Sequence, residues 1–296
     1  MAGTDTGTCP QTAPCKTIAY GFNQITTDTR NKLSVSQGTY NESPYWYQGA
    51  ATQLEWHGHG ATINVSYGDN YLYQFDTSIA IHDLTVHATA AGGKVFNFRA
   101  QGGTYSVDNV TADGADGVAF YGTSTAHNLK VIGAGGIYVG GFLTMDGAVL
   151  TGGGLSVGQM QISQGTVQIT NMLIDNAPVP IDVGNGIGYI NFSTIYTSVA
   201  SQSYGVICES PGVNFKGDIV IVTNANPSMG CTFVTSLVGG TATGPAWVDP
   251  TNHDFHLKST SPAIDQIPNG GPTTDLDGVA RPQGSAFDYG AYEFKP

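Results

Sequence analysis

The chain has 296 residues, of which 40% are hydrophobic and only 11% are charged, and its formal net charge at pH 7 is −12. Ten Lys and Arg residues against 22 Asp and Glu residues leave no basic surface. The composition therefore excludes nucleic acid as a partner, because that partner requires positive charge to neutralise phosphates. No apolar stretch approaches the roughly 20 residues that a membrane span needs.

The N-terminal region predicts a short cap. The opening residues lack the basic and apolar segments of a signal peptide, and we expect that an export signal has been removed ahead of them. Further on, Ile18, Phe22 and Ile25 recur at the spacing of one helical face. We expect residues 1–32 to form a cap with a short helix, followed by the first strand and its turn over Leu33–Tyr40.

Four cysteines fall into two short-range pairs, Cys9 with Cys15 and Cys208 with Cys231. Neither pair has the Cys-x-x-Cys spacing of a metal or redox motif. Two disulfides formed in an oxidising compartment are therefore expected, and four reduced, buried thiols are the alternative.

The middle of the chain carries a loose repeat in which an apolar residue is followed by a polar residue, usually a turn-type residue, and then another apolar one. Its six copies begin at Ile81, Val107, Ala126, Met145, Ile169 and Ile190. A second strand-like run follows most copies, as Val118–Phe120, Ile137–Val139, Leu155–Val157, Ile181–Val183 and Val206–Cys208. Short strands repeated in this way predict a β-solenoid. A β-sandwich with Gly-rich turns is the alternative.

The coils are expected to span residues 33–248, and residues 249–296 to form a distinct, irregular C-terminal capping segment, all within a single domain over residues 1–296. Asn128 and Asn171 occupy the turn position of their copies, where stacked Asn side chains would hydrogen-bond from coil to coil. Asp83 and Asn109 are expected to join that ladder.

Both ends of the chain resemble a known family. The motifs at the start are Gly3–Asp5, Pro14–Ile18 and Val35–Tyr40, and those at the end are Asp254–Leu257, Ser261–Asp265, Asp275–Gly278, Arg281–Pro282 and Asp288–Glu293. The start resembles pectin-lyase-like proteins, and the end resembles the C-terminal module of bacterial secreted β-helix proteins called choice-of-anchor Q. The resemblance implies an exported, all-β, single-stranded right-handed parallel β-helix. Its members include polysaccharide lyases, other sugar-active enzymes and proteins with no assigned reaction.

The segment Asp275–Gly278 also resembles part of a calcium-binding loop, which makes Ca²⁺ the one cofactor that the sequence suggests. The rest of an EF-hand pattern is missing. The alternative is structural: four acidic residues accept hydrogen bonds and pair with Arg281, tying the tail to the last coil. These four are Asp275, Asp277, Asp288 and Glu293.

In a solenoid, residues at one register form outward columns on successive coils. The resemblance implies a cleft next to longer loops, on a sheet other than the one that carries the repeat beginning at Ile81. A second column runs along the strand Val118–Phe120 and its equivalents. Outward positions there are Asn97, Ala119, Tyr138, Ser156 and Asp182, and one step further come Arg99, Tyr121 and Glu209. Besides histidine, the only basic residues between positions 33 and 215 are Lys94, Arg99 and Lys130.

These residues suit a polysaccharide lyase. Such an enzyme removes the proton α to a uronate carboxyl group, which takes a base, a cation to neutralise the carboxylate and often a Tyr that protonates the leaving oxygen. The predicted catalytic residues are Lys94, Arg99, Lys130, Tyr121 and Tyr138. Alternatively, Arg99 and Lys130 only pair with Asp113 and Asp116 on the surface.

Two other kinds of chemistry have candidates. A glycoside hydrolase needs two carboxyl groups, which Asp182 with Glu209, or Asp113 with Asp116, would supply. A column of polar residues on another sheet offers acids, bases or metal ligands, or merely solvated residues beside a turn; it comprises His82, Asp108, His127, Asp146, Thr170 and Asn191. His57–His59 reads as half of a metal site or as a Gly-rich turn.

Aromatic residues gather early in the coils. Tyr45, Trp46 and Tyr47 lie close to Trp56, Tyr67, Tyr71 and Tyr73 in the sequence. Exposed rings stack on sugars, although part of this set must belong to the core.

The sequence thus predicts a secreted β-helix protein that binds a polysaccharide and cleaves it by β-elimination, leaving the sugar and the oligomeric state open. A non-catalytic cell-surface adhesion module and a glycoside hydrolase are the alternatives. The residues expected to bind substrate are Asn97, Tyr45, Trp46, Tyr47 and Asp182.

Overall fold

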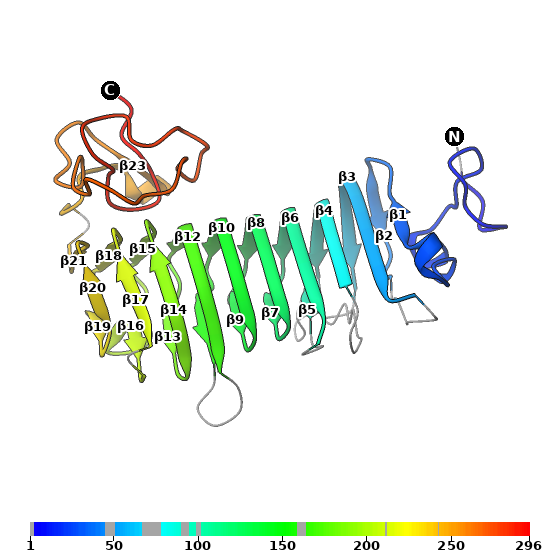
Figure 1. The fold of residues 1–296 in the computed structure, drawn as a ribbon, viewed down its shortest axis with the longest axis horizontal. Coiled ribbons are helices and arrows are strands. Elements are labelled where there is room, and N and C mark those ends of the chain that lie inside the picture. Colours follow the sequence, from blue (N-terminus) through cyan, green and yellow to red (C-terminus); the bar gives the residue numbers. More distant parts are fainter. Residues whose placement is uncertain are drawn as a thin grey trace. The chain divides into compact units, whose positions relative to one another are not determined.

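The computed structural model is an all-β parallel β-solenoid of about 7 turns, with a short helix near the N-terminus (Figure 1). It describes residues 3–44, 51–66, 78–89, 95–98, 102–158, 164–210, 212–241 and 243–296. The predicted parallel β-helix and its N-terminal helix are confirmed, and the fold is consistent with the pectin-lyase-like type. The chain divides into two compact units, Met1–Gly135 and Gly136–Pro296, which we describe in turn.

The first unit contains two sheets, which we name by the length of their strands. Its elements are α1 (Ile18–Asn23), η1 (Asp28–Arg30), β1 (Lys32–Ser34), β2 (Thr39–Asn41), β3 (Gln53–Val65), β4 (Ser78–Ala88), β5 (Phe96–Phe98), β6 (Thr104–Asp113), β7 (Val118–Phe120) and β8 (Thr123–Ile132). The long-strand sheet has the order β1-β3-β4-β6-β8 with β2 beside β3, and the short-strand sheet contains β5 and β7. All pairings are parallel.

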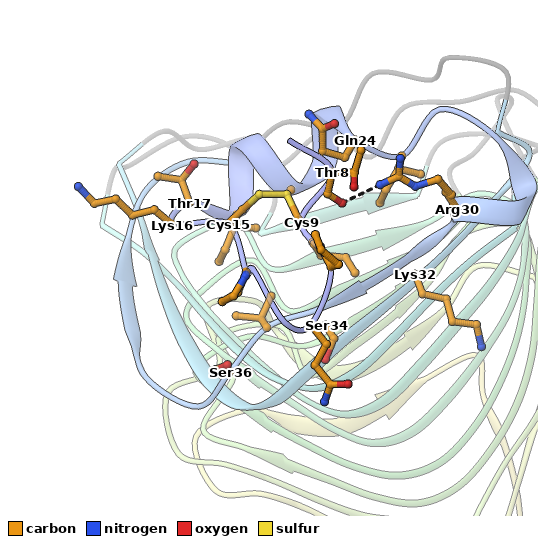
Figure 2. Close-up of a pocket in the computed structure, with 18 of the residues that line it drawn as sticks. Thr8, Cys9, Cys15, Lys16, Thr17, Gln24, Arg30, Lys32, Ser34 and Ser36 are labelled. Carbon is orange, nitrogen blue, oxygen red and sulfur yellow. Dashed lines mark hydrogen bonds between the residues drawn. A yellow bond between two sulfur atoms is a disulfide. The ribbon is translucent and has the colours of Figure 1, made fainter. Parts of the chain in front are cut away.

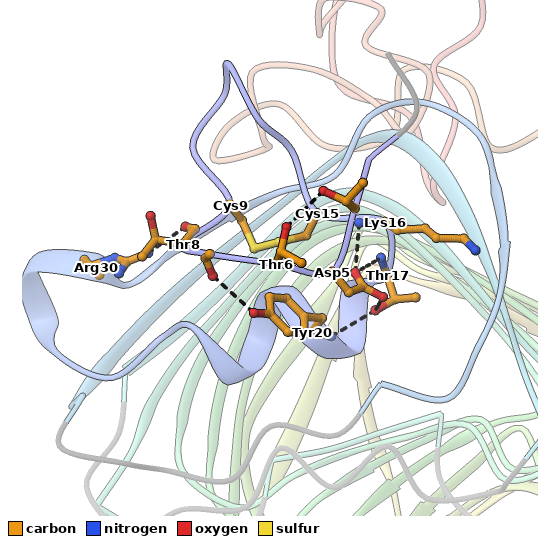
Figure 3. The surroundings of a disulfide bond; sticks show 11 residues. Asp5, Thr6, Thr8, Cys9, Cys15, Lys16, Thr17, Tyr20 and Arg30 are labelled. Carbon is orange, nitrogen blue, oxygen red and sulfur yellow. Dashed lines mark hydrogen bonds between the residues drawn. A yellow bond between two sulfur atoms is a disulfide. The ribbon is translucent and has the colours of Figure 1, made fainter.

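The N-terminal cap is fixed by polar side chains around α1. The Thr17 hydroxyl accepts a hydrogen bond from the Tyr20 N–H at 3.2 Å, so it satisfies one of the free donors at the start of the helix. The Asp5 carboxylate accepts the Lys16 and Thr17 N–H groups, each at 2.9 Å, close to the Cys9–Cys15 disulfide (Figure 3). Beneath this frame, the predicted apolar face is buried: Ile18, Phe22 and Ile25 are at most 5% exposed.

The long strands β4, β6 and β8 of the first unit each turn a corner at one residue with positive φ. Asp83, Asn109 and Asn128 have φ values of 53°, 52° and 49°, a conformation that Asn and Asp tolerate better than other side chains. The Asn128 Nδ2 group donates to Asn109 Oδ1 at 2.7 Å, and Asn109 Nδ2 donates to Asp83 Oδ1 at 3.2 Å. The expected ladder therefore joins three successive coils of the first unit, whereas Asn171 in the second unit donates through Nδ2 to Asp146 Oδ1 at 2.9 Å.

The second unit continues with coils and ends in a separate segment. Its strands are β9 (Ile137–Val139), β10 (Phe142–Thr151), β11 (Leu155–Val157), β12 (Gly165–Asp175), β13 (Ile181–Val183), β14 (Gly186–Asn191), β15 (Thr194–Thr197), β16 (Tyr204–Cys208), β17 (Val213–Lys216), β18 (Ile219–Val222), β19 (Asn226–Met229), β20 (Thr232–Val234), β21 (Leu237–Gly239), β22 (Trp247–Asp249) and β23 (Asp254–Leu257), with η2 at Pro250–Asn252. Here the short-strand sheet is β9-β11-β13-β16-β19, and the long-strand sheet runs β10-β12-β14-β17-β20 with β15, β18 and β21 alongside.

All five predicted second runs are strands of the short-strand sheet. Its alternate residues point inward, and Val139, Val157 and Val183 are fully buried. The last coil ends with β21, and β22 pairs antiparallel with β23. The segment that follows the last coil contains β22, which begins at Trp247, and β23.

The C-terminal segment packs on the outer side of the long-strand sheet in its own unit. Trp247 and Phe255 contact Tyr196 of β15, with ring centroids 5.6 and 5.3 Å away, and they join a core cluster with Ile219 and Ile221 of β18. A polar tie lies beside it, because His253 Nδ1 approaches Asp175 Oδ2 of β12 to 2.6 Å. Residues far apart in sequence therefore share one apolar core.

Acidic side chains organise the tail from within. Asp275 accepts the N–H groups of Asp277 and Val279 through Oδ1, at 2.9 and 2.8 Å, and that of Glu293 through Oδ2, at 2.9 Å. Buried Arg281 lies 3.4 Å from Glu293. The calcium-like motif is therefore built as a hydrogen-bonded turn, as the structural alternative expects.

Both expected disulfides are present. Cys9 is bonded to Cys15 and Cys208 to Cys231. The second bond joins β16 to the turn after β19, so it fastens the last coil to the one before it. Disulfides form in oxidising compartments, which points to an extracellular protein.

The corner residues predict a measurable difference between two substitutions at Asn128. Asn128→Ala loses the ladder hydrogen bond and places a Cβ-bearing residue at positive φ, which costs about 1–2 kcal/mol of the free energy of unfolding. Asn128→Gly loses the same bond but adopts this φ without strain, so it should cost less. Urea unfolding of the three proteins measures the difference; equal losses in the two variants contradict this explanation of the corner.

His256 predicts a pH-dependent stability. Burial is the largest effect and lowers its pKa, but bonds to Asp254 Oδ1 at 2.6 Å and Asp277 Oδ2 at 2.8 Å outweigh burial and raise it above 6.5. A pKa that is higher in the folded chain adds stability that is fully present below the unfolded value and is lost as the pH rises through the folded value.

His256→Gln should therefore lower the free energy of unfolding most at about pH 6, and the gap to the unchanged protein should shrink toward higher pH. Urea unfolding at a series of pH values measures that gap. A gap that stays constant or widens as the pH rises contradicts the assignment.

Candidate functional site

The predicted lyase residues of the first unit are only partly described. Lys94 and Arg99 lie outside the described residues. Tyr121 directly follows β7 of the short-strand sheet, whereas Lys130 is an exposed residue of β8 in the long-strand sheet, opposite Thr111. The two described members of this set therefore lie on different sheets.

The predicted substrate-binding residues differ in whether the structure describes them and in how exposed they are. Tyr45, Trp46 and Tyr47 lie outside the described residues. Asn97 is only 3% exposed, although alternation predicts an outward side chain, and its Oδ1 has no hydrogen-bond partner among the described groups. All three residues of β5 and of β7 are buried, so the outer face of the short-strand sheet is closed at these strands.

In the second unit, the same sheet is open. Tyr138 on β9, Ser156 on β11 and Asp182 on β13 stand opposite one another in the parallel register and are partly exposed. The row continues to Ile207 on β16, which is buried, and to Met229 on β19, which is 40% exposed. We call the outward row of Tyr138, Ser156 and Asp182, together with Glu209, the column face.

Glu209 follows β16 and is fixed to the neighbouring coil, because its N–H donates to the Val183 carbonyl at 2.9 Å. It is therefore placed beside the coil that carries Asp182. Burial raises the pKa of Asp182, and the negative charge of Glu209 raises it further. Two carboxyl groups in such unequal surroundings can serve as a proton donor and an ionised partner.

The column face has low relief. The residues two positions before and after Tyr138, Ser156 and Asp182 are Gly136, Gly140, Gly154, Gly158, Pro180 and Gly184. At Gly136 and Gly154 a Cβ atom would collide with the backbone of the next coil, so the close coil spacing itself requires glycine. A flat floor with one aromatic ring and a few polar groups is a surface on which an extended chain can lie.

The column face carries no basic side chain. The Lys and Arg residues of the second unit are Lys216, Lys258, Arg281 and Lys295, and all four belong to the described residues. None of them lies on β9, β11, β13, β16 or β19. Within the described part of this unit, the strands of the face therefore offer no cation for a uronate carboxylate.

A cavity of about 1200 Å³ lies beneath the N-terminal cap, between the disulfide loop, α1 and β1 (Figure 2). Three cations line it, Lys16, Arg30 and Lys32. Arg30 Nη2 donates to the Thr8 carbonyl at 2.7 Å, and Lys32 Nζ is 2.7 Å from Glu55 Oε2. Their bonds within the chain favour a role in holding the cap over a role in binding.

The histidine-rich column of the long-strand sheet pairs its groups within the chain. His127 Nδ1 lies 2.9 Å from Asp108 Oδ1, and the rings of His57 and His82 stack with centroids 4.9 Å apart. His59 Nε2 bonds to the Ser34 hydroxyl at 2.9 Å. In the second unit, Thr170 Oγ1 donates to Asp146 Oδ1 at 2.8 Å, and Asn191 stands opposite Thr170.

Across the described ranges, no group of three or more His, Cys, Asp or Glu side chains is arranged to hold a metal ion. None of the described helices has the length and apolarity to cross a bilayer.

Sequence reasoning identified Asp182 and Glu209 as a carboxyl pair but missed two features of the face. Ile207 and Met229 extend the row with apolar side chains, and the strand register is the signal that would have placed them there. The alternation pattern did not predict that the side chain of Asn97 is buried.

Comparisons of the chain with protein-family models, with curated proteins and with solved structures give no match.

Proposed function

We propose that this protein is a secreted β-helix protein that binds a neutral polysaccharide on the column face and hydrolyses its glycosidic bonds with Asp182 and Glu209. The observation that carries the proposal is the raised pKa of Asp182, caused by burial and by the charge of Glu209 on an accessible face.

The binding part rests on shape and chemistry. Successive coils place side chains at a spacing of roughly 4.8 Å, so a sugar chain lying across the coils meets Tyr138, Ser156 and Asp182 in turn. The Tyr138 ring is suited to stack on a sugar face, and the Ser156 hydroxyl can exchange hydrogen bonds with sugar hydroxyls. A neutral ligand suits a chain with a formal net charge of −12 and a face without cations.

The catalytic part assigns one role to each carboxyl group. Protonated Asp182 donates its proton to the glycosidic oxygen, so that the leaving sugar departs as an alcohol. Ionised Glu209 either takes a proton from the attacking water or attacks the sugar carbon itself. The separation of the carboxyl groups in the substrate complex selects between inversion and retention.

β-Elimination is the second candidate. It rests on Tyr121, which leaves the short-strand sheet of the first unit directly after β7, and on the sequence positions of Lys94 and Arg99. Lys130 belongs to the other sheet, and the strands of the column face carry no cation, so hydrolysis has the stronger support. A non-catalytic surface or adhesion module would use the same face for binding alone.

The proposal predicts the effect of two isosteric substitutions. Asp182→Asn and Glu209→Gln should each lower kcat on a neutral polysaccharide by about 10²-fold or more, because each removes one proton-transfer group. The measurement is the release of reducing ends from a panel of neutral and uronate polysaccharides, together with the absorbance of unsaturated products.

Asp83→Asn is the matched control, since it makes the same change of charge at a corner where the next coil already carries Asn109. It should retain full activity. For the unchanged protein, the rate should fall as the pH rises through the raised pKa of Asp182, because the donor must be protonated. Unsaturated products establish β-elimination instead, and polysaccharide binding without any product establishes a binding module.

A further inference from the structure

The first coil and the last coil differ in whether another segment covers them. In the first unit, α1 and the disulfide loop cover the start of the coils, with Phe22 only 1% exposed. In the second unit, β19, β20 and β21 form the last coil (Figure 1). Among the described residues, each of these strands pairs on one side only, with β16, β17 and β18 respectively.

The interior of the last coil is open. Val238 stands opposite Val220, an inward residue with 0% exposure, yet Val238 itself is 39% exposed. Phe233 likewise lies on buried Phe215, with ring centroids 4.8 Å apart, and remains partly exposed. Inward apolar side chains that every earlier coil covers are uncovered here.

The backbone of this coil is also unpaired on its outer side. Alternate residues of a parallel strand bond to the same neighbour. Gly217 donates to the Val234 carbonyl, and Leu237 donates to the Asp218 carbonyl. Phe233 precedes Val234 and Val238 follows Leu237, so these two residues direct their N–H and C=O groups to the other side of their strands, away from the sheet.

The last coil also lacks the charged side chains that usually protect a sheet edge. Residues 219–248 contain no Asp, Glu, Lys, Arg or His, in a chain with a formal net charge of −12. Natural proteins protect edges with charges, Pro, bulges or a covering segment. Pro227 protects β19, but β20 and β21 have no such residue, and the C-terminal segment packs on the outer face of the sheet, next to Ile219 and Ile221.

We propose that the edge of β20 and β21 is a self-association surface at which a second copy of this chain docks end to end. An unpaired strand edge can form hydrogen bonds with a strand of another chain. Two identical edges pair across a two-fold axis, which makes the pairing antiparallel. Two acidic copies repel each other over most of their surface, but not at this uncharged end. The covered start of the coils is not available as the partner edge.

The test compares two lysine variants by light scattering over a range of protein concentrations. In the unchanged protein, the mass should rise from one chain to two as the concentration increases. Val238→Lys places a charge at the open interior, where its side chain can reach solvent, and should remain at the mass of one chain. Val199→Lys is the control, because Val199 is 49% exposed and follows β15, which β18 separates from β21.

Val234→Lys provides a second variant on the same coil. Val234 is 48% exposed, so this change leaves the folded chain intact. Its lysine should weaken the dimer as well, since the two-fold axis brings like charges together. The proposal is overturned if the unchanged protein keeps the mass of one chain at every concentration. It is equally overturned if folded Val238→Lys and Val234→Lys proteins both dimerise like the Val199→Lys control.

Discussion

The backbone pairing between successive coils is the constraint on which the rest of this molecule depends. Each coil must present its N–H and C=O groups to its neighbours at a spacing of roughly 4.8 Å, so every coil has to repeat the same path. The corner residues Asp83, Asn109 and Asn128 share one φ region for this reason. In the second unit, Gly147, Asn171 and Gly217 meet the same requirement, and buried Phe192 and exposed Thr235 are exceptions.

Phe192 occupies a corner with positive φ although it is not Gly, Asn or Asp, and contacts from the tail hold it there. Its φ of 51° is unfavourable for a large side chain. The ring contacts the tail, where the Arg281 guanidinium carbon lies 5.5 Å from the ring centroid and the Phe287 ring 6.0 Å away. The C-terminal segment thus contributes contacts that hold a strained corner, which links the coils and the tail energetically.

The same constraint shapes the candidate site. Parallel register turns sequence positions that are far apart into one row, so Tyr138, Ser156 and Asp182 become neighbours without any loop to position them. The neighbouring coils also desolvate Asp182 and bring the charge of Glu209 close to it. An unequal pair of carboxyl groups is therefore a direct result of stacking, and glycines beside the row keep it accessible.

Much of the fold could be predicted because the solenoid repeats its signals. Alternation placed the strands Val118–Phe120 and Ile137–Val139, and the spacing of Ile18, Phe22 and Ile25 placed the helix of the cap. The site was less predictable, since alternation gives a side chain's direction but not what covers it. Alternation predicts an outward side chain at both Asn97 and Asp182, yet Asn97 is buried and Asp182 is partly exposed.

Binding of a neutral polysaccharide to the column face is the central claim, and affinity electrophoresis tests it most directly. The protein should be retarded in gels that contain at least one neutral polysaccharide. Ser156→Trp, which fills the middle of the face, should abolish the retardation, whereas Ser106→Trp on the outer side of the first unit's long-strand sheet should leave it unchanged. Retardation that survives Ser156→Trp but is lost with Ser106→Trp would place binding on the other sheet and contradict the account.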